Sequence, residues 1–158
     1  MNDQSILRDA RFSDADEGPL RLRALDGDDL QVVSALVQDA VSTVADVSFL
    51  RGHRRFAVLL NRFRWEGAAR TPERVRSLLV VENALAVRSQ GVDPGAKDTV
   101  LSLLALAWAG EPDGPGRLLL TLAGDGAVAV ECEALEVLLQ DVTKPYLAPS
   151  RRMPRHPD

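Results

Sequence analysis

Residues 54–65, RRFAVLLNRFRW, alternate in the way that is typical of a β-strand rather than a helix. Phe56, Val58 and Leu60 fall on one face of such a strand, while its other face also carries apolar side chains. Because both faces are apolar, the pattern predicts a central strand that is covered on both sides. Arg62 and Arg64 follow the apolar part of the Phe56 face, so we expect them at the rim of the sheet.

The segments on either side extend this pattern. Residues 27–41 carry apolar side chains at spacings of three and four, which predicts an amphipathic helix with Asp26 as its N-cap. Alternation with a period of two predicts strands elsewhere. The segments concerned are 19–25, 45–50, 74–81, 84–92, 99–108 and two strands within 117–142 that turn at 124–126.

The last of these strands contains a phase shift. Val128, Val130 and Cys132 are apolar at even positions, whereas Leu135, Val137 and Leu139 are apolar at odd ones. A straight strand cannot keep both sets on one face, so the sequence predicts a bulge or sharp bend near residues 133–134.

Together these patterns predict an α+β fold. One amphipathic helix near the N-terminus packs on a largely antiparallel sheet of eight or nine strands, curled as a barrel or as two packed sheets; a pleckstrin-like barrel is one such arrangement. We expect a loosely ordered acidic arm over residues 1–18, a single domain over 19–143, and a Pro/Arg-rich tail over 144–158.

Length and composition are those of an ordinary globular protein. The chain has 158 residues, of which 46% are hydrophobic and 27% charged, so it can bury a core without a metal or a disulfide. Cys132 is the single cysteine, which fits a reducing compartment. The N-terminus does not read as a signal peptide, and the longest apolar run, residues 100–109, is about half of a membrane span. We therefore expect a cytoplasmic protein with no membrane partner.

The net charge of −4 conceals a basic middle, because residues 51–88 carry nine arginines and three glutamates. An anionic partner is one explanation of this asymmetry. Pairing with the protein's own acidic residues is the other, and we favour it. The anion- or partner-binding candidates are Arg54, Arg55, Arg62 and Arg64, and the aspartates of the predicted helix are their expected partners: Asp26, Asp28, Asp29 and Asp39.

Catalytic and metal-binding patterns are scarce. Glu131 and Glu133 share a strand face at a spacing that acid/base carboxylate pairs also use, but nearly every amphipathic strand offers this spacing, so a solvated face is the favoured interpretation. Cys132 lies between these glutamates and is expected to be a core residue. His53 and His156 belong to no metal-binding spacing, and no phosphate-binding loop is present. We therefore expect no metal and no cofactor.

Several long segments, in the same order, resemble a small bacterial family known only as domain of unknown function 2948. They include residues 18–41, 54–66, 74–81 and 117–142, and the likeness covers about residues 18–145. The resemblance implies a stand-alone cytoplasmic protein and brings no activity, cofactor or catalytic residue.

These observations favour a non-enzymatic binding or protein-interaction module, whose partner is an unknown protein or a small anionic ligand. One alternative is an enzyme in which Glu131 and Glu133 act with Arg62 or Arg64 on an anionic small molecule. A second alternative, weak nucleic-acid binding through residues 51–88, is disfavoured because Phe63 and Trp65 lie on the face opposite the arginines. The presence or absence of a concave pocket that joins these arginines and glutamates would distinguish the three functions. A monomer is slightly favoured over a homodimer.

Overall fold

Eleven strands and one α-helix make up residues 19–66 and 73–147, which are the residues that the computed structural model describes. The predicted arm 1–18 and tail residues 148–158, including His156, lie outside this range. The helix is α2 (Gly27–Leu36), and two 3₁₀ turns are η1 (Val44–Asp46) and η2 (Arg51–His53). The strands are β1 (Arg21–Ala24), β2 (Val41–Thr43), β3 (Val47–Leu50), β4 (Arg55–Phe63), β5 (Glu73–Glu82), β6 (Ala84–Gln90), β7 (Val100–Gly110), β8 (Gly116–Leu122), β9 (Ala127–Cys132), β10 (Val137–Asp141) and β11 (Tyr146–Leu147).

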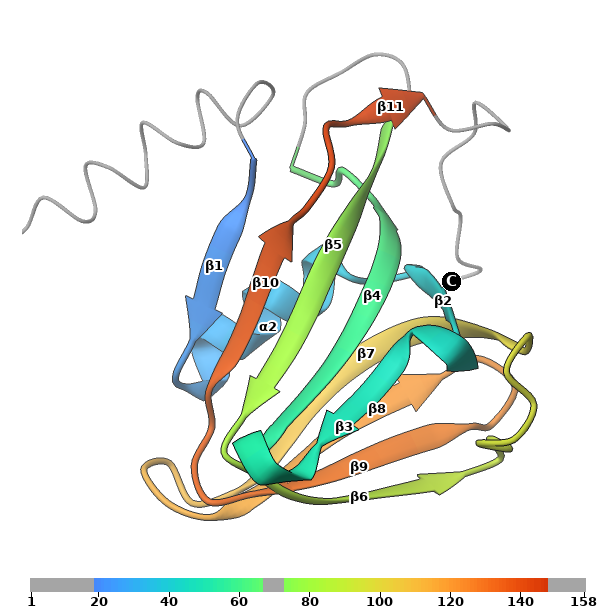
Figure 1. Cartoon of the computed structure of the whole chain (residues 1–158). Helices are drawn as coiled ribbons and strands as arrows, with labels where there is room; N and C mark the ends of the chain where they lie inside the picture. Colours follow the sequence, from blue (N-terminus) through green and yellow to red (C-terminus); the bar gives the residue numbers. More distant parts are fainter. Residues whose placement is uncertain (1–18, 67–72, 148–158) are drawn as a thin grey trace, which may run out of the picture.

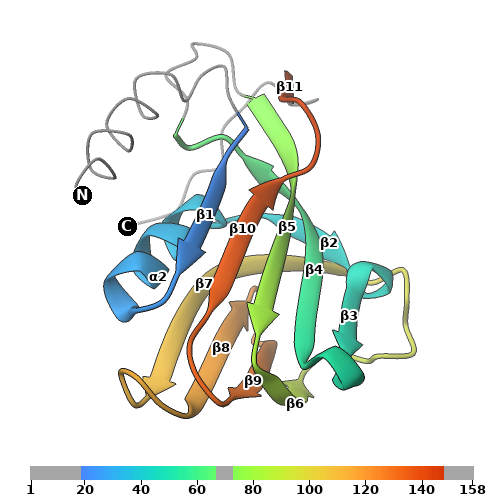
Figure 2. The ribbon, with the colours of Figure 1, turned by 60° about the vertical axis from the view of Figure 1, so that its left-hand side comes forward.

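The strands form one antiparallel path in the order β1-β10-β5-β4-β2-β7-β8-β9-β6, with β3 attached to β4 and β11 to β5. The path folds over at β2 and β7 into two layers, which cross each other in Figures 1 and 2. We call β1, β10, β5, β4 and β3 the first layer and β7, β8, β9 and β6 the second. The α+β class is confirmed and two packed layers are present, but the described sheet is not closed into a barrel.

The expected number of strands is too low because β2 and β11, with three and two residues, are too short to be predicted. The strand predicted over residues 45–50 is present as β3 and pairs with β4. The predicted helix extends five residues too far, because α2 ends at Leu36, Asp39 adopts a left-handed φ of 65° in a turn, and β2 begins at Val41. Because η1 separates β2 from β3, this stretch shows no long alternation that sequence reasoning can detect.

The start of α2 is as the sequence predicts. The carboxylate of Asp26 accepts a hydrogen bond from the backbone N–H of Asp29 at 2.8 Å, which is the expected N-cap. The helix packs against β1 and β7 at one side of the molecule (Figure 2). Leu30 and Val33 are buried there, and the hydroxyl of Ser34 accepts from the N–H of Leu106 in β7.

The predicted phase shift marks the place where the chain changes layers. Strand β9 ends at Cys132 in the second layer, and β10 begins at Val137 in the first. The four residues between them make the bend, so the even-numbered and the odd-numbered apolar side chains both face the space between the layers. The predicted turn at residues 124–126 is also present, with a left-handed φ at Asp125, and Asn83 adopts a left-handed φ between β5 and β6.

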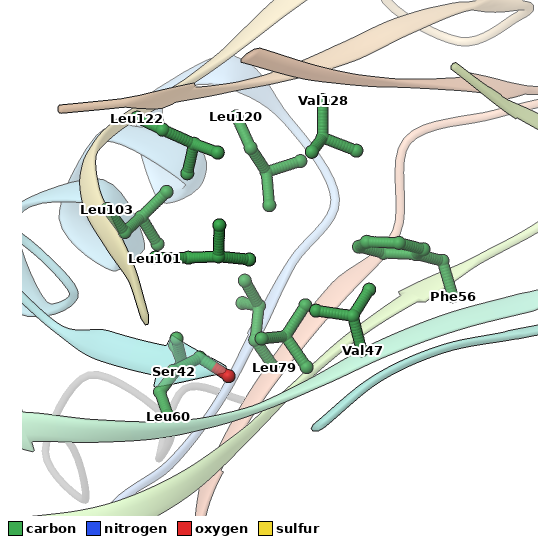
Figure 3. A pocket seen from close by; sticks show the side chains of 11 residues that line it. Ser42, Val47, Phe56, Leu60, Leu79, Leu101, Leu103, Leu120, Leu122 and Val128 are labelled. Carbon is green, nitrogen blue, oxygen red and sulfur yellow. The ribbon is translucent and has the colours of Figure 1, made fainter. Parts of the chain in front are cut away.

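The core lies between the two layers and leaves a cavity of about 30 Å³. Figure 3 shows aliphatic side chains and Phe56 from both layers converging on it. Ser42 is the polar residue among those that line it, and its hydroxyl donates to the carbonyl of Leu59 at 2.8 Å. A space of this size holds about one water molecule, so the core offers no room for a substrate. In the described part of the chain, no helix is both long and apolar enough to cross a membrane.

Candidate functional site

Arg62 and Arg64 lie inside the first layer rather than at its rim. Their exposed fractions are 0% and 4%. Arg62 continues the inward face of β4 beyond Leu60, and side chains from later in the chain close over it. The expectation of a rim position is therefore wrong, because distant acidic residues cover this end of the strand.

Arg62 is held by carboxylates on two sides. Its Nη1 and Nη2 donate to the two oxygens of Glu66 at 2.9 and 2.8 Å, and Nη2 also donates to Asp141 at 2.9 Å. Burial is the largest influence on the guanidinium and lowers its pKa, but hydrogen bonds and charge from Glu66 and Asp141 outweigh it, so the pKa of Arg62 is raised. The side chain therefore remains charged inside the protein.

Asp141 of β10 joins two further segments, β5 and the start of β1, to this cluster. It accepts from the hydroxyl of Ser77 at 2.7 Å and from the N–H of Leu20 at 2.9 Å, while Arg62 Nε donates to the same hydroxyl at 2.9 Å. Ser77 is fully buried, so its hydroxyl cannot meet a substrate. The cluster therefore clamps the start of β1 to β4, β5 and β10, which is a structural arrangement and not an exposed anion site.

The other two candidate arginines are paired at the surface. Arg54 donates to Glu133 at 2.6 Å, and Arg55 donates to Glu82 at 2.9 Å. The hydrogen bond and charge of Glu82 raise the pKa of Arg55. Arg64, at the buried end of β4, donates to Glu73 at 2.6 Å. All four candidate arginines thus pair with the protein's own carboxylates, as expected, and the pairs described above are with Glu66, Glu73, Glu82, Glu133 and Asp141, which lie outside the predicted helix.

The two candidate catalytic glutamates are also held in ion pairs. Glu131 accepts from Arg117 at 2.6 Å, and Glu133 from Arg54. Because Arg54 precedes β4 and Arg62 lies near its end, Glu133 is far along the strand from the buried cluster. Neither the cavity of about 30 Å³ nor an open groove of about 170 Å³ beside β2 and β4 is lined by either glutamate. Neither cavity therefore joins these glutamates to Arg62 or Arg64, as the enzyme alternative requires.

A different surface stands out on the side of the first layer that is turned away from the second, which we call the outer face. Cross-strand neighbours of β4, β5 and β10 place partly exposed aliphatic side chains together at its centre. This aliphatic strip consists of Ala57, Leu59, Leu78, Val80 and Leu138. Figure 1 shows no described element lying over it. The prediction that both faces of β4 are covered is therefore wrong for the described residues, since only the inward face is.

Arginines surround the aliphatic strip. The strand registers place Arg21 and Arg23 of β1, Arg55 of β4, and Arg74 and Arg76 of β5 on the outer face. Two glutamates lie among them: Glu82 pairs with Arg55, and Glu136 lies 3.5 Å from Arg23. Two aspartates lie at the end of the face, since Asp46 shares a groove with Arg76 and the charge of Asp39 acts on Arg74. Five positive charges against these four negative ones leave a small positive excess on the outer face, although the whole chain carries a net charge of −4.

A family model described as "Protein of unknown function (DUF2948)" matches residues 20–156, which is most of the chain. The chain belongs to this family. The resemblance noted from the sequence is thereby confirmed. No curated protein and no solved structure matches the chain.

The single thiol of this DUF2948 protein is in the core, as the sequence predicts. Cys132 is 2% exposed, and burial together with the charge of Glu131 raises its pKa to about 11. The thiolate that nucleophilic chemistry requires is therefore disfavoured near neutral pH. His53 is exposed in η2. Within residues 19–66 and 73–147, no cluster of three or more His, Cys, Asp or Glu side chains could hold a metal ion.

Sequence reasoning missed the outer face of this DUF2948 protein, although a signal was present. Residues 74–80 alternate so that Arg74, Arg76, Leu78 and Val80 share one side of β5. The same alternation places Asn61 of β4 opposite Arg76. The apolar residues on this side predicted that another part of the protein covers it. The arginines on the same side were considered separately, so the combination of arginines and aliphatic residues on one surface was missed.

Proposed function

We propose that this DUF2948 protein is a non-catalytic interaction module that binds an acidic segment of another protein on its outer face. The observation that carries the proposal is the aliphatic strip, which is partly exposed on a central strand pair and surrounded by arginines. Exposed apolar patches with polar borders are typical of protein-binding surfaces. Arginine is also enriched at such interfaces.

The charge of the outer face argues for an acidic partner. Its five arginines exceed its two glutamates and the two aspartates at its end, and both glutamates are already paired with arginines. A second copy of this chain, related by a two-fold axis through the outer face, would bring two positively charged surfaces together. Like charges in contact cost several kcal/mol at an interface, so charge complementarity disfavours that dimer.

The two alternative functions have less support. An enzyme acting through Glu131 and Glu133 would need them beside Arg62 or Arg64, whereas each glutamate is paired with a different arginine. For nucleic acid, a single-strand binder presents aromatic side chains for stacking beside its cations. The strip beside these arginines is aliphatic.

Affinity capture with matched variants tests the proposal. The wild-type protein is immobilised beside a strip variant, Leu59→Gln with Leu78→Gln, and a control variant, Leu119→Gln with Ala129→Gln. Each pair consists of cross-strand neighbours on an exterior face, the control pair lying in the second layer. Proteins captured from the native lysate are quantified by mass spectrometry, before and after nuclease treatment, and thermal melts establish that all three proteins are folded.

We expect a small set of acidic proteins that the wild type and the control capture and that the strip variant loses by about tenfold or more. Binding of the purified candidate to each variant should show the same difference. Capture that is equal for all three proteins, or that disappears after nuclease treatment, would overturn the proposal; the second result would favour the nucleic-acid alternative.

A further inference from the structure

Arg74 occupies one end of the outer face and is held in a fixed position. Its guanidinium lies 4.1 Å from the centre of the Phe63 ring, and its Nε donates to the side-chain oxygen of Asn61. Nη2 donates to the backbone carbonyl of the same residue at 3.2 Å. Asn61 in turn donates to the hydroxyl of Tyr146 at 2.6 Å. The fork of Arg74 is thus oriented in advance, which reduces the entropy that a bound ligand must remove.

Among residues 19–66 and 73–147, no carboxylate lies within ion-pair distance of Arg74, although the charge of Asp39 acts on it from further away. The four arginines of residues 54–64 each have such a partner, so Arg74 differs from its neighbours along the basic segment. Burial lowers the pKa of Arg74 more than the weaker influences of Tyr146 and Asp39 raise it. The site therefore holds a partly desolvated cation whose charge is not balanced at contact distance, and an added anion would stabilise it.

Arg76 supplies a second cation on the same side of β5. Two residues along a strand span about 7 Å, and Arg76 is exposed and lacks an ion-pair partner among the described residues. Asn61 pairs with it across the strands. Asn61 and Arg76 also line the open groove of about 170 Å³, together with Thr43 and Asp46 of the neighbouring segment. A side chain of a bound segment can thus reach the two arginines from the aliphatic strip.

We propose that Arg74 and Arg76 form a carboxylate-binding subsite at the end of the outer face, which takes an aspartate or glutamate side chain of the protein partner. The inference rests on the proposed function, because the aliphatic strip would hold the rest of the same segment. Arg74 offers a planar fork that suits a carboxylate, and Arg76 offers a more exposed and adaptable contact.

A protein carboxylate fits these surroundings better than a nucleic-acid phosphate. The Phe63 ring is 3% exposed and is covered by Arg74, so it cannot stack on a base. The side chains that continue from the two arginines along the outer face are Leu78 and Val80, which suit the aliphatic side chains of a peptide.

A titration followed by nuclear magnetic resonance tests the subsite. The probe is an N-acetylated peptide of ten glutamates, and a ten-nucleotide oligothymidylate serves as the phosphate comparison. The Nε–Hε signals of the arginines are observed in the wild type, in Arg76→Gln, and in Arg74→Gln with Arg76→Gln. Arg88→Gln is the matched control, because Arg88 is also an exposed strand arginine without an ion pair among the described residues but belongs to β6 of the second layer.

We expect saturable shifts at Arg74 and Arg76, with affinity weakened about tenfold or more in the double variant because charge-assisted hydrogen bonds are lost. Arg88→Gln should have little effect. Arg76 has no side-chain hydrogen bond among the described residues, so Arg76→Gln alone should weaken binding in a protein that is still folded. Equal shifts at Arg88, unchanged affinity in the double variant, or tighter binding of oligothymidylate would overturn the subsite.

The subsite and the proposed function can fail separately. If capture of an acidic protein is lost in the strip variant but unchanged by Arg74→Gln with Arg76→Gln, the interaction module stands and the subsite is wrong. If the glutamate peptide binds at the two arginines while no captured protein depends on the aliphatic strip, the subsite stands and the proposed function is wrong.

Discussion

The two ends of β4 carry similar sequences in opposite environments. Arg54 and Arg55 at its start are exposed or partly exposed and pair with Glu133 and Glu82 at the surface. Arg62 near its end is fully buried and pairs with Asp141 and Glu66. Strands β4 and β10 both pair antiparallel with β5, so they run parallel to each other. Each of the two ion pairs, Arg54–Glu133 and Arg62–Asp141, therefore joins residues at the same separation of 79 positions.

The difference shows that burial, and not the presence of a partner, decides what an arginine contributes. An exposed ion pair gains little, because water already stabilises both charges and salt screens them. A buried pair has lost that hydration, so each charge depends on the other and on its hydrogen bonds. The same residue type, at two ends of one strand, should therefore differ widely in its effect on stability.

The largest effect is expected when Arg62 is replaced by alanine. Asp141 would then remain buried without its cation and Glu66 would keep only Arg64, at 3.9 Å, which costs about 3–5 kcal/mol of unfolding free energy. Denaturant-induced unfolding followed by circular dichroism measures the loss. The triple variant Arg62→Met, Glu66→Gln, Asp141→Asn removes all three charges together and should recover part of the stability; a triple variant less stable than Arg62→Ala would contradict this explanation.

An intermediate effect is expected from Cys132, a buried ionisable group that has no cation beside it. Its pKa is about 11 when folded and about 9 when unfolded. Between these values the unfolded chain loses the proton and the folded protein keeps it, so unfolding becomes easier as the pH rises from 9 to 11. The full shift corresponds to about 2.7 kcal/mol, and solvent screening reduces the expected loss to about 1–2 kcal/mol.

Comparison with Cys132→Ala isolates this contribution from the other groups that titrate at high pH. The variant should be less stable at pH 8 but should lose less stability than the wild type between pH 9 and 11. Parallel stability profiles for the two proteins would show that the thiol does not contribute. Thiol-specific alkylation at pH 8 should also be slow in the folded wild type, since Cys132 is buried.

The smallest effect is expected at the other end of β4. Arg54→Ala removes an exposed pair with Glu133 and should cost about 0–1 kcal/mol, with the difference falling further at high salt. The same unfolding measurement, made beside Arg62→Ala, gives the contrast directly. Equal losses for Arg54→Ala and Arg62→Ala would mean that burial of Arg62 has little influence on the pair.

Much of the fold follows from local sequence patterns. Three predictions that each depend on a short segment correspond to features of the structure. They are the strand from the alternation of residues 55–63, the Asp26 cap of the helix, and the bend from the phase shift near residue 133. Local patterns are informative here because side-chain periodicity and capping are decided within a few residues. The short strands β2 and β11 were missed because two or three residues show no clear period.

The candidate site was less predictable because it depends on pairing between distant segments. The sequence identified Arg62 and Arg64 as noteworthy but gave no means to place Asp141 beside Arg62, since that contact requires the register of β4, β5 and β10. The outer face likewise depends on the pairing of distant strands. Its aliphatic strip and its arginines come from β1, β4, β5 and β10, and only the assembled layer shows that they adjoin.

The pairing of β1 with β10 has a consequence for how the protein is made. Arg21 pairs with Gln140, which is 119 positions later, and β10 is the strand neighbour of β1 in the described sheet. At a synthesis rate of about 5–20 residues per second, β1 leaves the ribosome roughly 6–24 s before its neighbour exists. During that interval Leu22 and Ala24 have no completed layer to join, so the nascent chain depends on chaperones, or on β1 remaining unpaired, until the last long strand is synthesised.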